Sequence, residues 1–305
     1  MPTRRFANIG RSSSGHSSAE RRFALRGGRG ISDPRLTAVR GDIADIGLAG
    51  AIFVPHYVEP EPRSVASATM LRARPGECEP ATTQLLGGET FMLLDVEGGW
   101  AWGWCAHDHY VGFLPVEALI APVAASHVVH VRSALLFAEP DIKSTVLKTH
   151  PMGTRLAGSC EAGGWLALAA GGFVHARHAA ALAALAADPV ALAEALVGAP
   201  YVWGGRAGDG LDCSGLVQLV HGLVGIALPR DSDQIAEAGE AVASRAELRR
   251  GDAVCFPGHI GLMVDSDRMV HANAHWMAVT IEPLDAVLAR FDDPAAAIVG
   301  MRRFA

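Results

Sequence analysis

The sequence predicts a multidomain protein in which two small antiparallel β-barrels precede one α+β domain. Three observations lead to this prediction. The chain has 305 residues, more than a single hydrophobic core usually serves. A pattern of short apolar segments and turns occurs twice between residues 62 and 182, as in barrels built from short strands. Helix and strand signals then alternate from 183 to 305, which indicates a mixed domain.

The first 61 residues precede the repeat. Residues 1–32 are rich in Arg, Ser and Gly and have few large apolar side chains, so they cannot bury enough apolar surface to fold. We therefore expect a disordered tail at 1–32 and a short N-terminal extension at 33–61. The tail lacks the apolar core of a secretory signal peptide, which favours a cytoplasmic location.

Charge and cysteine content narrow the class of protein. The 26 basic and 32 acidic residues give a net charge of −6, whereas nucleic-acid-binding surfaces are basic, so we expect no nucleic-acid partner. No apolar run reaches the roughly 18 residues of a membrane span. The five cysteines show no C-x-x-C spacing, which argues against a disulfide or zinc framework and fits a reducing cytoplasm.

Equal offsets reveal the internal repeat. The positions that recur 65 residues apart are Leu71 and Leu136, Pro75 and Pro140, Gly88 and Gly153, and Trp100 and Trp165. Gly112-Phe113 then matches Gly172-Phe173 at an offset of 60, so the second copy has a shorter loop. Each copy alternates apolar segments with Gly, Pro, Asp and Glu turns, which predicts two barrels of the same design.

This pattern resembles bacterial SH3-like domains, which places the first at 62–122 and the second at 123–182. The resemblance implies that they dock a ligand or position a substrate; a purely structural role as spacers is the alternative. Within the first copy, His107-Asp108-His109 invites a metal-binding interpretation, but we expect a solvated hairpin tip.

Residues 183–305 form the predicted α+β domain. A Gly-rich loop leads to Asp212-Cys213-Ser214-Gly215, and the apolar residues from Leu216 to Val224 recur at helical spacing. Cys213 thus stands at the start of a helix, where unpaired N–H groups and the helix dipole lower a thiol's pKa and can hold an oxyanion. This position predicts a nucleophile, with a buried structural cysteine as the alternative.

A thiol nucleophile needs a base, which is usually distant in sequence. His259 begins an apolar strand after a Pro-Gly turn, and His271 lies on the next strand. Adjacent antiparallel strands can bring the two imidazoles together if the turn sets the register. His259 is the predicted base and His271 the residue that orients it. His275 is the alternative for the third position.

Six motifs of this region resemble those of the NlpC-type cell-wall peptidases, a family with a papain-like fold. They are, in order, Pro-Tyr-x-Trp-Gly-Gly (200–205), Asp-Cys-Ser-Gly (212–215), Pro-Arg-x-Ser-x-Gln (229–234), Arg-Gly-Asp (250–252), Gly-His-Ile-Gly (258–261) and His-Ala (271–272). The SH3-like pair in front resembles murein-recycling members. The resemblance implies a cysteine peptidase domain at 183–305.

It also implies roles for individual residues. Cys213, His259 and His271 would form the catalytic triad, and Tyr201 would support the oxyanion. Asp212 and Ser214 would bind the free amine of a leading L-Ala; the alternative for Asp212 is a helix cap. The implied substrates are peptidoglycan-derived peptides, cut between γ-D-glutamate and a diamino acid such as diaminopimelate. No metal or organic cofactor is expected.

Three other functions are alternatives to peptide hydrolysis. The chain could bind murein fragments without cleaving them, or it could transfer the acyl group of the same acyl-enzyme to an amine. A metallohydrolase built on His259, His271 and Asp265 is the third alternative. The sequence does not specify the diamino acid, whether a free N-terminal L-Ala is required, the oligomeric state, or the SH3-like residues that complete the substrate site. Arg206 and Arg230 could bind carboxylates of the substrate, but they could equally hold two loops of the protein together.

Overall fold

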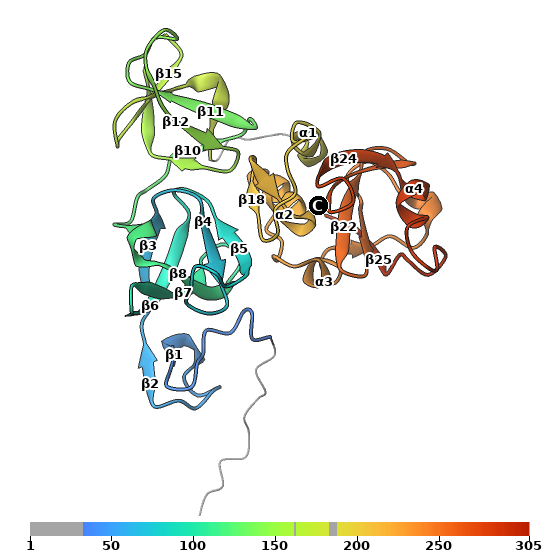
Figure 1. Ribbon diagram of the computed structural model, residues 1–305, viewed down its shortest axis with the longest axis horizontal. Coiled ribbons are helices and arrows are strands. Elements are labelled where there is room, and N and C mark those ends of the chain that lie inside the picture. Colours follow the sequence, from blue (N-terminus) through green and yellow to red (C-terminus); the bar gives the residue numbers. More distant parts are fainter. Residues whose placement is uncertain (1–32, 162, 183–187, 305) are drawn as a thin grey trace, which may run out of the picture.

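The computed structural model describes residues 33–161, 163–182 and 188–304. The predicted disordered tail at 1–32 lies outside these residues. Figure 1 shows the two barrels stacked along one side of the molecule and the α+β domain on the other side. In the described part of the chain, no helix is long and apolar enough to cross a membrane.

The N-terminal extension packs on the first barrel. It contains β1 (Ile43–Asp45), the 3-10 turn η1 (Ile46–Leu48) and β2 (His56–Val58), and β1 pairs with β2 in parallel. Ile43 packs with Leu94 and Trp102 of the barrel. The Nε1–H of Trp104 donates to Asp45 Oδ2 at 2.8 Å. Arg40 pairs with Asp95, and the N–H of Val111 donates to the carbonyl oxygen of Arg35 at 2.8 Å. The extension is therefore anchored by apolar packing and by several polar contacts.

The first barrel is a seven-stranded antiparallel sheet with the order β5-β4-β8-β7-β6-β3-β9. Leu71, Phe91 and Leu114 fill its centre. Its elements are β3 (Glu61–Val65), β4 (Thr69–Arg72), β5 (Ala81–Leu85), β6 (Thr90–Glu97), β7 (Trp100–Cys105), β8 (Val111–Pro115), η2 (Val116–Ala118) and β9 (Leu119–Ile120).

The second barrel repeats this strand order. Its five-stranded sheet runs β12-β11-β16-β15-β14, which matches β5-β4-β8-β7-β6 strand for strand, beside a sheet of order β13-β10-β17. The repeated Leu136, like Leu71, is buried. The elements are β10 (His127–Val129), β11 (Ser133–Phe137), β12 (Val146–Pro151), β13 (Arg155–Leu156), β14 (Gly158–Glu161), β15 (Trp165–Leu168), β16 (Phe173–His175), η3 (Ala176–His178) and β17 (Ala179–Ala181).

Two glycines of the repeat lie where domains meet. Gly88 has φ +79°, and a Cβ there would lie 2.4 Å from the carbonyl oxygen of Arg155 in the second barrel. Gly153 has φ +90°, and a Cβ there would approach Leu86 of the first barrel and Leu219 of the α+β domain to 2.4 and 2.7 Å. Both positions combine a left-handed backbone with a close contact, so only glycine fits.

The α+β domain places helices against a six-stranded antiparallel sheet of order β20-β25-β21-β22-β23-β24. The apolar side of α2 packs on this sheet, with Leu216, Val220 and Ile260 buried in one cluster. The elements are α1 (Pro189–Glu194), β18 (Arg206–Ala207), β19 (Gly210–Leu211), α2 (Cys213–Leu223), α3 (Ser232–Ile235), β20 (Glu240–Ala241), η4 (Arg245–Glu247), β21 (Ala253–Phe256), β22 (His259–Met263), β23 (Arg268–Asn273), β24 (Ala278–Pro283), α4 (Leu284–Leu288) and β25 (Gly300–Arg303).

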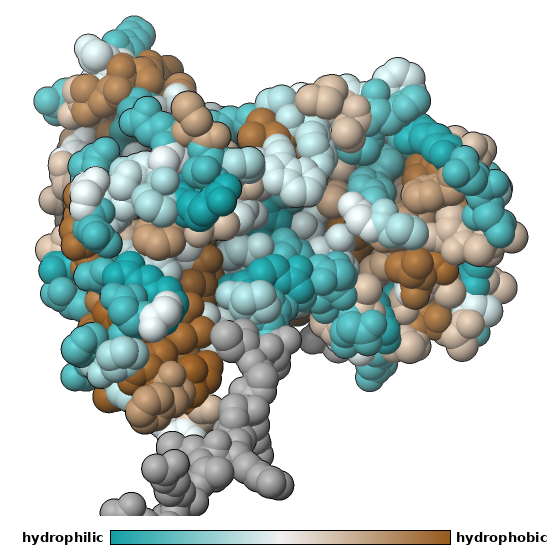
Figure 2. All heavy atoms as spheres, turned by 60° about the horizontal axis from the view of Figure 1, so that its bottom comes forward, coloured by the Kyte–Doolittle hydropathy of each residue, from teal (hydrophilic) through white to brown (hydrophobic). Residues whose placement is uncertain are grey.

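Polar contacts join the first barrel to the α+β domain. Gln218 on α2 donates through Nε2 to Asp108 Oδ2 at 2.9 Å, and the side chain of Asp108 is fully buried. The solvated hairpin tip expected at His107-Asp108-His109 is therefore wrong for the side chain of Asp108, which contacts α2, whereas His109 is exposed. In the space-filling view, the two lobes meet along a seam with many hydrophilic residues (Figure 2).

Candidate active site

Cys213 is the first residue of α2 and follows the Gly-rich loop. Asp212 caps the helix, since its Oδ1 accepts a hydrogen bond from the N–H of Gly215 at 2.7 Å. A Cβ at Gly215 would lie 2.1 Å from the carbonyl oxygen of Gly205. The loop therefore packs so closely against the helix start that glycine is needed there.

Asp212, Ser214 and Arg230 form a buried cluster around the nucleophile position. Arg230 donates to Asp212 Oδ2 at 2.6 Å and Oδ1 at 3.0 Å, and to Ser214 Oγ at 2.8 Å. The N–H of Gly204 also donates to Asp212 Oδ2, at 2.9 Å. Both carboxylate oxygens of Asp212 thus have partners inside the protein, and the residue is 6% exposed. Substrate binding by Asp212 and Ser214 stays a prediction.

The thiol of Cys213 is protonated in the free protein. Burial raises the pKa of Cys213 to about 11, and the carboxylate of Asp212 also raises it, while the backbone N–H groups of Ile260 and Ser214 lower it. The lowered pKa expected from the helix start is therefore wrong, because loss of hydration disfavours the thiolate more than the N–H groups favour it. A base must take the proton as the thiol reacts.

The two predicted histidines lie together beside Cys213. His259 Nε2 is 2.8 Å from His271 Nδ1, and the Cys213 thiol hydrogen-bonds the backbone of Ile260, the residue after His259. In the register of β22 and β23, Leu262 faces Val270, so the histidines are diagonal rather than opposite neighbours. A Cβ at Gly261 would come within 2.9 Å of the Cβ of His271, so glycine makes room for the imidazole.

Behind His271 lies a carboxylate that the sequence analysis did not identify. Glu282 Oε2 is 2.8 Å from His271 Nε2. Arg290 Nη1 donates to the same oxygen at 3.0 Å, and Trp276 Nε1 donates to Oε1 at 2.6 Å. Because His271 faces Thr280 across β23 and β24, Glu282 is its diagonal neighbour. The strand register, which no sequence motif reveals, is the signal that would have found Glu282.

A cleft of about 720 Å³ opens in front of Cys213. The first barrel contributes Glu79 and Tyr110 to it, and the α+β domain contributes Trp203 and Asp231. The hydroxyl of Tyr110 donates to Asp231 Oδ2 at 3.0 Å across the two domains. The sequence analysis missed Glu79, Tyr110 and Asp231, because their shared position depends on how the barrel docks.

Tyr201 lies at the edge of the core that carries Cys213. Burial, followed by the nearby Cys213 and Asp212, raises the pKa of Tyr201 to about 12. Its hydroxyl is therefore a hydrogen-bond donor at neutral pH. This is compatible with oxyanion support, which stays a prediction.

Two residues that the sequence analysis gave as alternatives, His275 and Asp265, lie away from the paired histidines. His275 is exposed and contacts the indole of Trp276 with ring centroids 4.8 Å apart, whereas His271 is the histidine whose Nδ1 lies 2.8 Å from His259 Nε2. Asp265 lies in the β22–β23 turn and pairs with Arg268 at 2.7 Å. Within the described ranges, no group of three His, Cys, Asp or Glu side chains could hold a metal ion.

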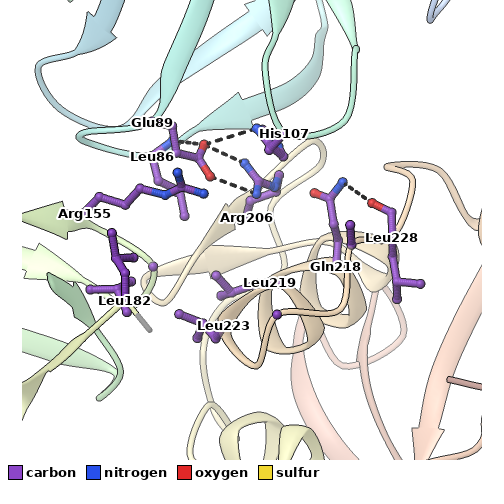
Figure 3. Close-up of a pocket in the computed structure, with 15 residues that line it drawn as sticks. Leu86, Glu89, His107, Arg155, Leu182, Arg206, Gln218, Leu219, Leu223 and Leu228 are labelled. Carbon is purple, nitrogen blue, oxygen red and sulfur yellow. Dashed lines mark hydrogen bonds and ion pairs between the residues drawn. The ribbon is translucent and has the colours of Figure 1, made fainter. Parts of the chain in front are cut away.

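A second cavity, of about 210 Å³, lies at the junction of the three domains. Figure 3 shows its charged wall, where Arg206 of β18 and Glu89 of the first barrel point toward each other. Their side chains form a two-point ion pair at 2.9 and 3.2 Å. Leu219 and Leu223 of α2 form its apolar side (Figure 3). The ion pair joins the first barrel to β18, which precedes the helix of Cys213 in the chain.

Together, these features define a class: two SH3-like barrels followed by a papain-like α+β domain with a helix-start cysteine and paired histidines. Residues 198–289 match the NlpC/P60 family model, and residues 71–119 match the model described as bacterial dipeptidyl-peptidase Sh3 domain. The chain thus carries an NlpC/P60 domain and a bacterial SH3 domain, which confirms the predicted fold class and resemblance.

Three curated relatives illustrate the extent of this similarity. A probable endopeptidase of Mycobacterium tuberculosis is 41% identical over 93 residues, which are 30% of this chain and 24% of the relative. A γ-D-glutamyl-L-lysine dipeptidyl-peptidase of Bacillus cereus is 30% identical over 106 residues, or 32% of each protein. Dipeptidyl-peptidase 6 of Lysinibacillus sphaericus is 29% identical over 177 residues, covering 53% of this chain and 65% of the relative. The first relative is thus matched over about a quarter of its length.

A solved structure supports the domain arrangement. An NlpC/P60 family protein from Bacillus cereus superposes with a TM-score of 0.68 over 80% of this chain and 99% of that chain, at 20% sequence identity. At this level of sequence identity the similarity shows a shared fold and nothing further.

Proposed function

We propose that this protein is a cysteine peptidase that hydrolyses the bond between γ-D-glutamate and a diamino acid in peptidoglycan-derived peptides. The observation that carries the proposal is the hydrogen bond between His259 and His271, 2.8 Å long, beside a cysteine at a helix start. A thiol, a base and an orienting group are the elements of nucleophilic acyl transfer.

The reaction proceeds through an acyl-enzyme. As the sulfur of Cys213 bonds to the amide carbon, His259 takes the thiol proton, and the carbonyl oxygen becomes an oxyanion. The backbone N–H of Cys213 and the hydroxyl of Tyr201 stabilise that charge. His259 then protonates the leaving amine as the carbon–nitrogen bond breaks. Water attacks the thioester with His259 as the base and restores the free thiol.

The cleft suits a peptide with a free amino terminus. Glu79 and Asp231 place carboxylates on its walls, and a carboxylate near a cleft mouth can hold an ammonium group. We assign amine binding to these two carboxylates together with the predicted Asp212 and Ser214, with Tyr110 in support. Each carboxylate also pairs with an arginine: Glu79 with Arg74, Asp231 with Arg35 and Asp212 with Arg230. Two relatives are named dipeptidyl-peptidases, a name that fits the release of a dipeptide such as L-Ala-D-Glu.

We further propose that these peptides are met in the cytoplasm, during murein recycling. Released stem peptides have free amino termini, whereas those in intact peptidoglycan are attached to the glycan. A site that requires a free amine therefore selects released fragments over the polymer. The third-position diamino acid follows from neither the cleft nor the motifs.

The test is to incubate the protein with L-Ala-γ-D-Glu-diaminopimelate and, in parallel, with its N-acetylated form. We expect L-Ala-D-Glu and diaminopimelate from the free peptide, and at least a roughly tenfold lower kcat/KM for the blocked one, the loss of one charged hydrogen bond. Equal rates would contradict the amine requirement. Cleavage of neither peptide would contradict the peptidase proposal and favour an inert binding protein. A competing amine that captured the acyl group would indicate a transferase.

A further inference from the structure

Three side chains form a hydrogen-bonded line that ends close to the nucleophile. His259 Nε2 is 2.8 Å from His271 Nδ1, and His271 Nε2 is 2.8 Å from Glu282 Oε2; Cys213 hydrogen-bonds the backbone of Ile260, the residue after His259. We infer that Glu282 is a positioning residue that fixes the tautomers of both histidines and so directs the bare nitrogen of His259 toward Cys213. The inference rests on the proposed function.

The direction of every bond follows from the carboxylate end. Ionised Glu282 can only accept hydrogen bonds, so His271 carries its proton on Nε2. A neutral imidazole then has a lone pair on Nδ1, and this atom can only accept. His259 must therefore donate from its Nε2–H, which leaves its Nδ1 without a proton. Nδ1 is the one remaining nitrogen of His259, and it is the atom that can take the thiol proton of Cys213.

Both imidazoles are neutral, as this argument requires. Burial lowers the pKa of His259 to about 3, with His271 and Arg290 acting in the same direction and Glu282 against it. Burial also lowers the pKa of His271, which outweighs the opposing effect of Glu282. The charged groups that face the pair are Glu282 and Arg290. In contrast, Glu282 is held ionised, because hydrogen bonds from Arg290, Trp276 and His271 outweigh burial and hold its pKa at about 2.

The partners of Glu282 make a specific prediction for a neutral amide at this position. Trp276 Nε1 and Arg290 Nη2 donate to Oε1, whereas Oε2 accepts from Arg290 Nη1 and faces His271. In Glu282→Gln the amide oxygen would take the place of Oε1, because both donors there are fixed and would clash with an amide NH2, whereas only Arg290 Nη1 is a fixed donor at the place of Oε2. The amide nitrogen would then face His271. It would donate to His271 Nε2, which would move the proton of His271 to Nδ1. That proton would then point at His259 Nε2, and His259 would carry its own proton on Nδ1, facing Cys213.

The carboxylate also acts during the reaction. When His259 accepts the thiol proton on Nδ1 it becomes an imidazolium, and its Nε2–H still donates to His271 Nδ1. The negative charge of Glu282, one imidazole away, favours this cation. Glu282 itself neither gains nor loses a proton, and the proton on His259 later leaves with the amine.

Histidine tautomers can be read directly from the 15N chemical shifts of the imidazole rings. We would compare the wild type with Glu282→Gln and with the conservative Glu282→Asp at pH 7. Glu237→Gln is the matched control, since this Glu lies on the surface with its side chain 87% exposed. Measuring kcat on the free tripeptide in the same variants links tautomer to rate.

The wild type, Glu282→Asp and Glu237→Gln should show both histidines protonated on Nε2. In Glu282→Gln both histidines should be protonated on Nδ1. The kcat of this variant should fall about 100-fold, which is the rate that a correctly protonated general base typically contributes. A wild type with His271 protonated on Nδ1 overturns the inference, as does Glu282→Gln with unchanged tautomers or an unchanged kcat. The wild-type spectrum decides the matter even if Glu282→Gln does not fold. No substrate is needed for it, so a failed peptide assay leaves this test standing.

Discussion

Arg230 and Asp212 form a buried ion pair directly beside the nucleophile, with Nη2 and Oδ2 2.6 Å apart. The side chains are 1% and 9% exposed, and Arg230 also donates to Thr83 of the first barrel at 2.7 Å. One guanidinium thus joins the cap of the catalytic helix to the barrel that completes the cleft. Arg230 therefore links two domains at the site, and its guanidinium is not free to bind a substrate carboxylate.

Removal of this guanidinium should lower the free energy of unfolding substantially. Arg230→Ala leaves Asp212 buried without its counter-charge, which typically costs about 3–5 kcal/mol. Arg268→Ala is the control, because its partner Asp265 is exposed and such pairs contribute at most about 1 kcal/mol. Denaturant unfolding of both variants measures the difference. Equal losses of unfolding free energy would contradict the role of Arg230.

The contact between the barrels is tested by paired glycine substitutions. Gly88 and Gly99 both have a left-handed backbone, with φ +79° and φ +84°, but only Gly88 faces another chain segment, the carbonyl of Arg155. Gly88→Ala should therefore destabilise by about 1–3 kcal/mol more than Gly99→Ala, the usual cost of overpacking. Thermal unfolding reports the difference. Similar midpoints in the two variants would show that the barrels do not pack as described.

The ion pair between Glu89 and Arg206 makes stability depend on pH. Burial opposes ionisation of Glu89, but Arg206 and His107 outweigh it and hold its pKa at about 2, against 4.5 for a free glutamate. Because the folded-state pKa is the lower one, this stabilisation is complete above pH 4.5 and is lost as the pH falls toward 2.

Unfolding free energies of the wild type and Glu89→Gln should therefore differ in their pH dependence. Between pH 4.5 and 2 the wild type should lose more stability than the variant. At pH 7 the variant itself should be less stable by about 3–5 kcal/mol, since Arg206 remains buried and unpaired. Parallel curves across this pH range would exclude a folded-state interaction of the Glu89 carboxylate.

Local sequence patterns predicted the parts of the site that depend on a single segment. The Asp-Cys-Ser-Gly motif correctly placed Cys213 at a helix start, and equal offsets identified two barrels with one strand order. The 12-residue spacing of His259 and His271 was enough to bring them together once two strands were assumed. These predictions succeed because each depends on neighbours in sequence or on one turn.

The remaining features depend on long-range packing. Glu282 reaches His271 only in the register of β23 and β24, and Tyr110 meets Asp231 only when the barrel docks. The pKa of Cys213 was predicted in the wrong direction, because the sequence shows the helix start but not the degree of burial. Asp108 was placed in solvent for the same reason, since nothing local indicates that α2 covers it.

The central claim is that Cys213 is the nucleophile, and one paired substitution tests it most directly. Cys255 is buried in the same hydrophobic cluster, and burial also raises its pKa to about 11, but it lies on β21 and lines no part of the cleft described above. We would measure hydrolysis of L-Ala-γ-D-Glu-diaminopimelate by Cys213→Ala and Cys255→Ala, with thermal unfolding to verify folding. The account predicts that Cys213→Ala folds but has no activity, while Cys255→Ala retains the wild-type rate. Wild-type hydrolysis by folded Cys213→Ala would contradict it.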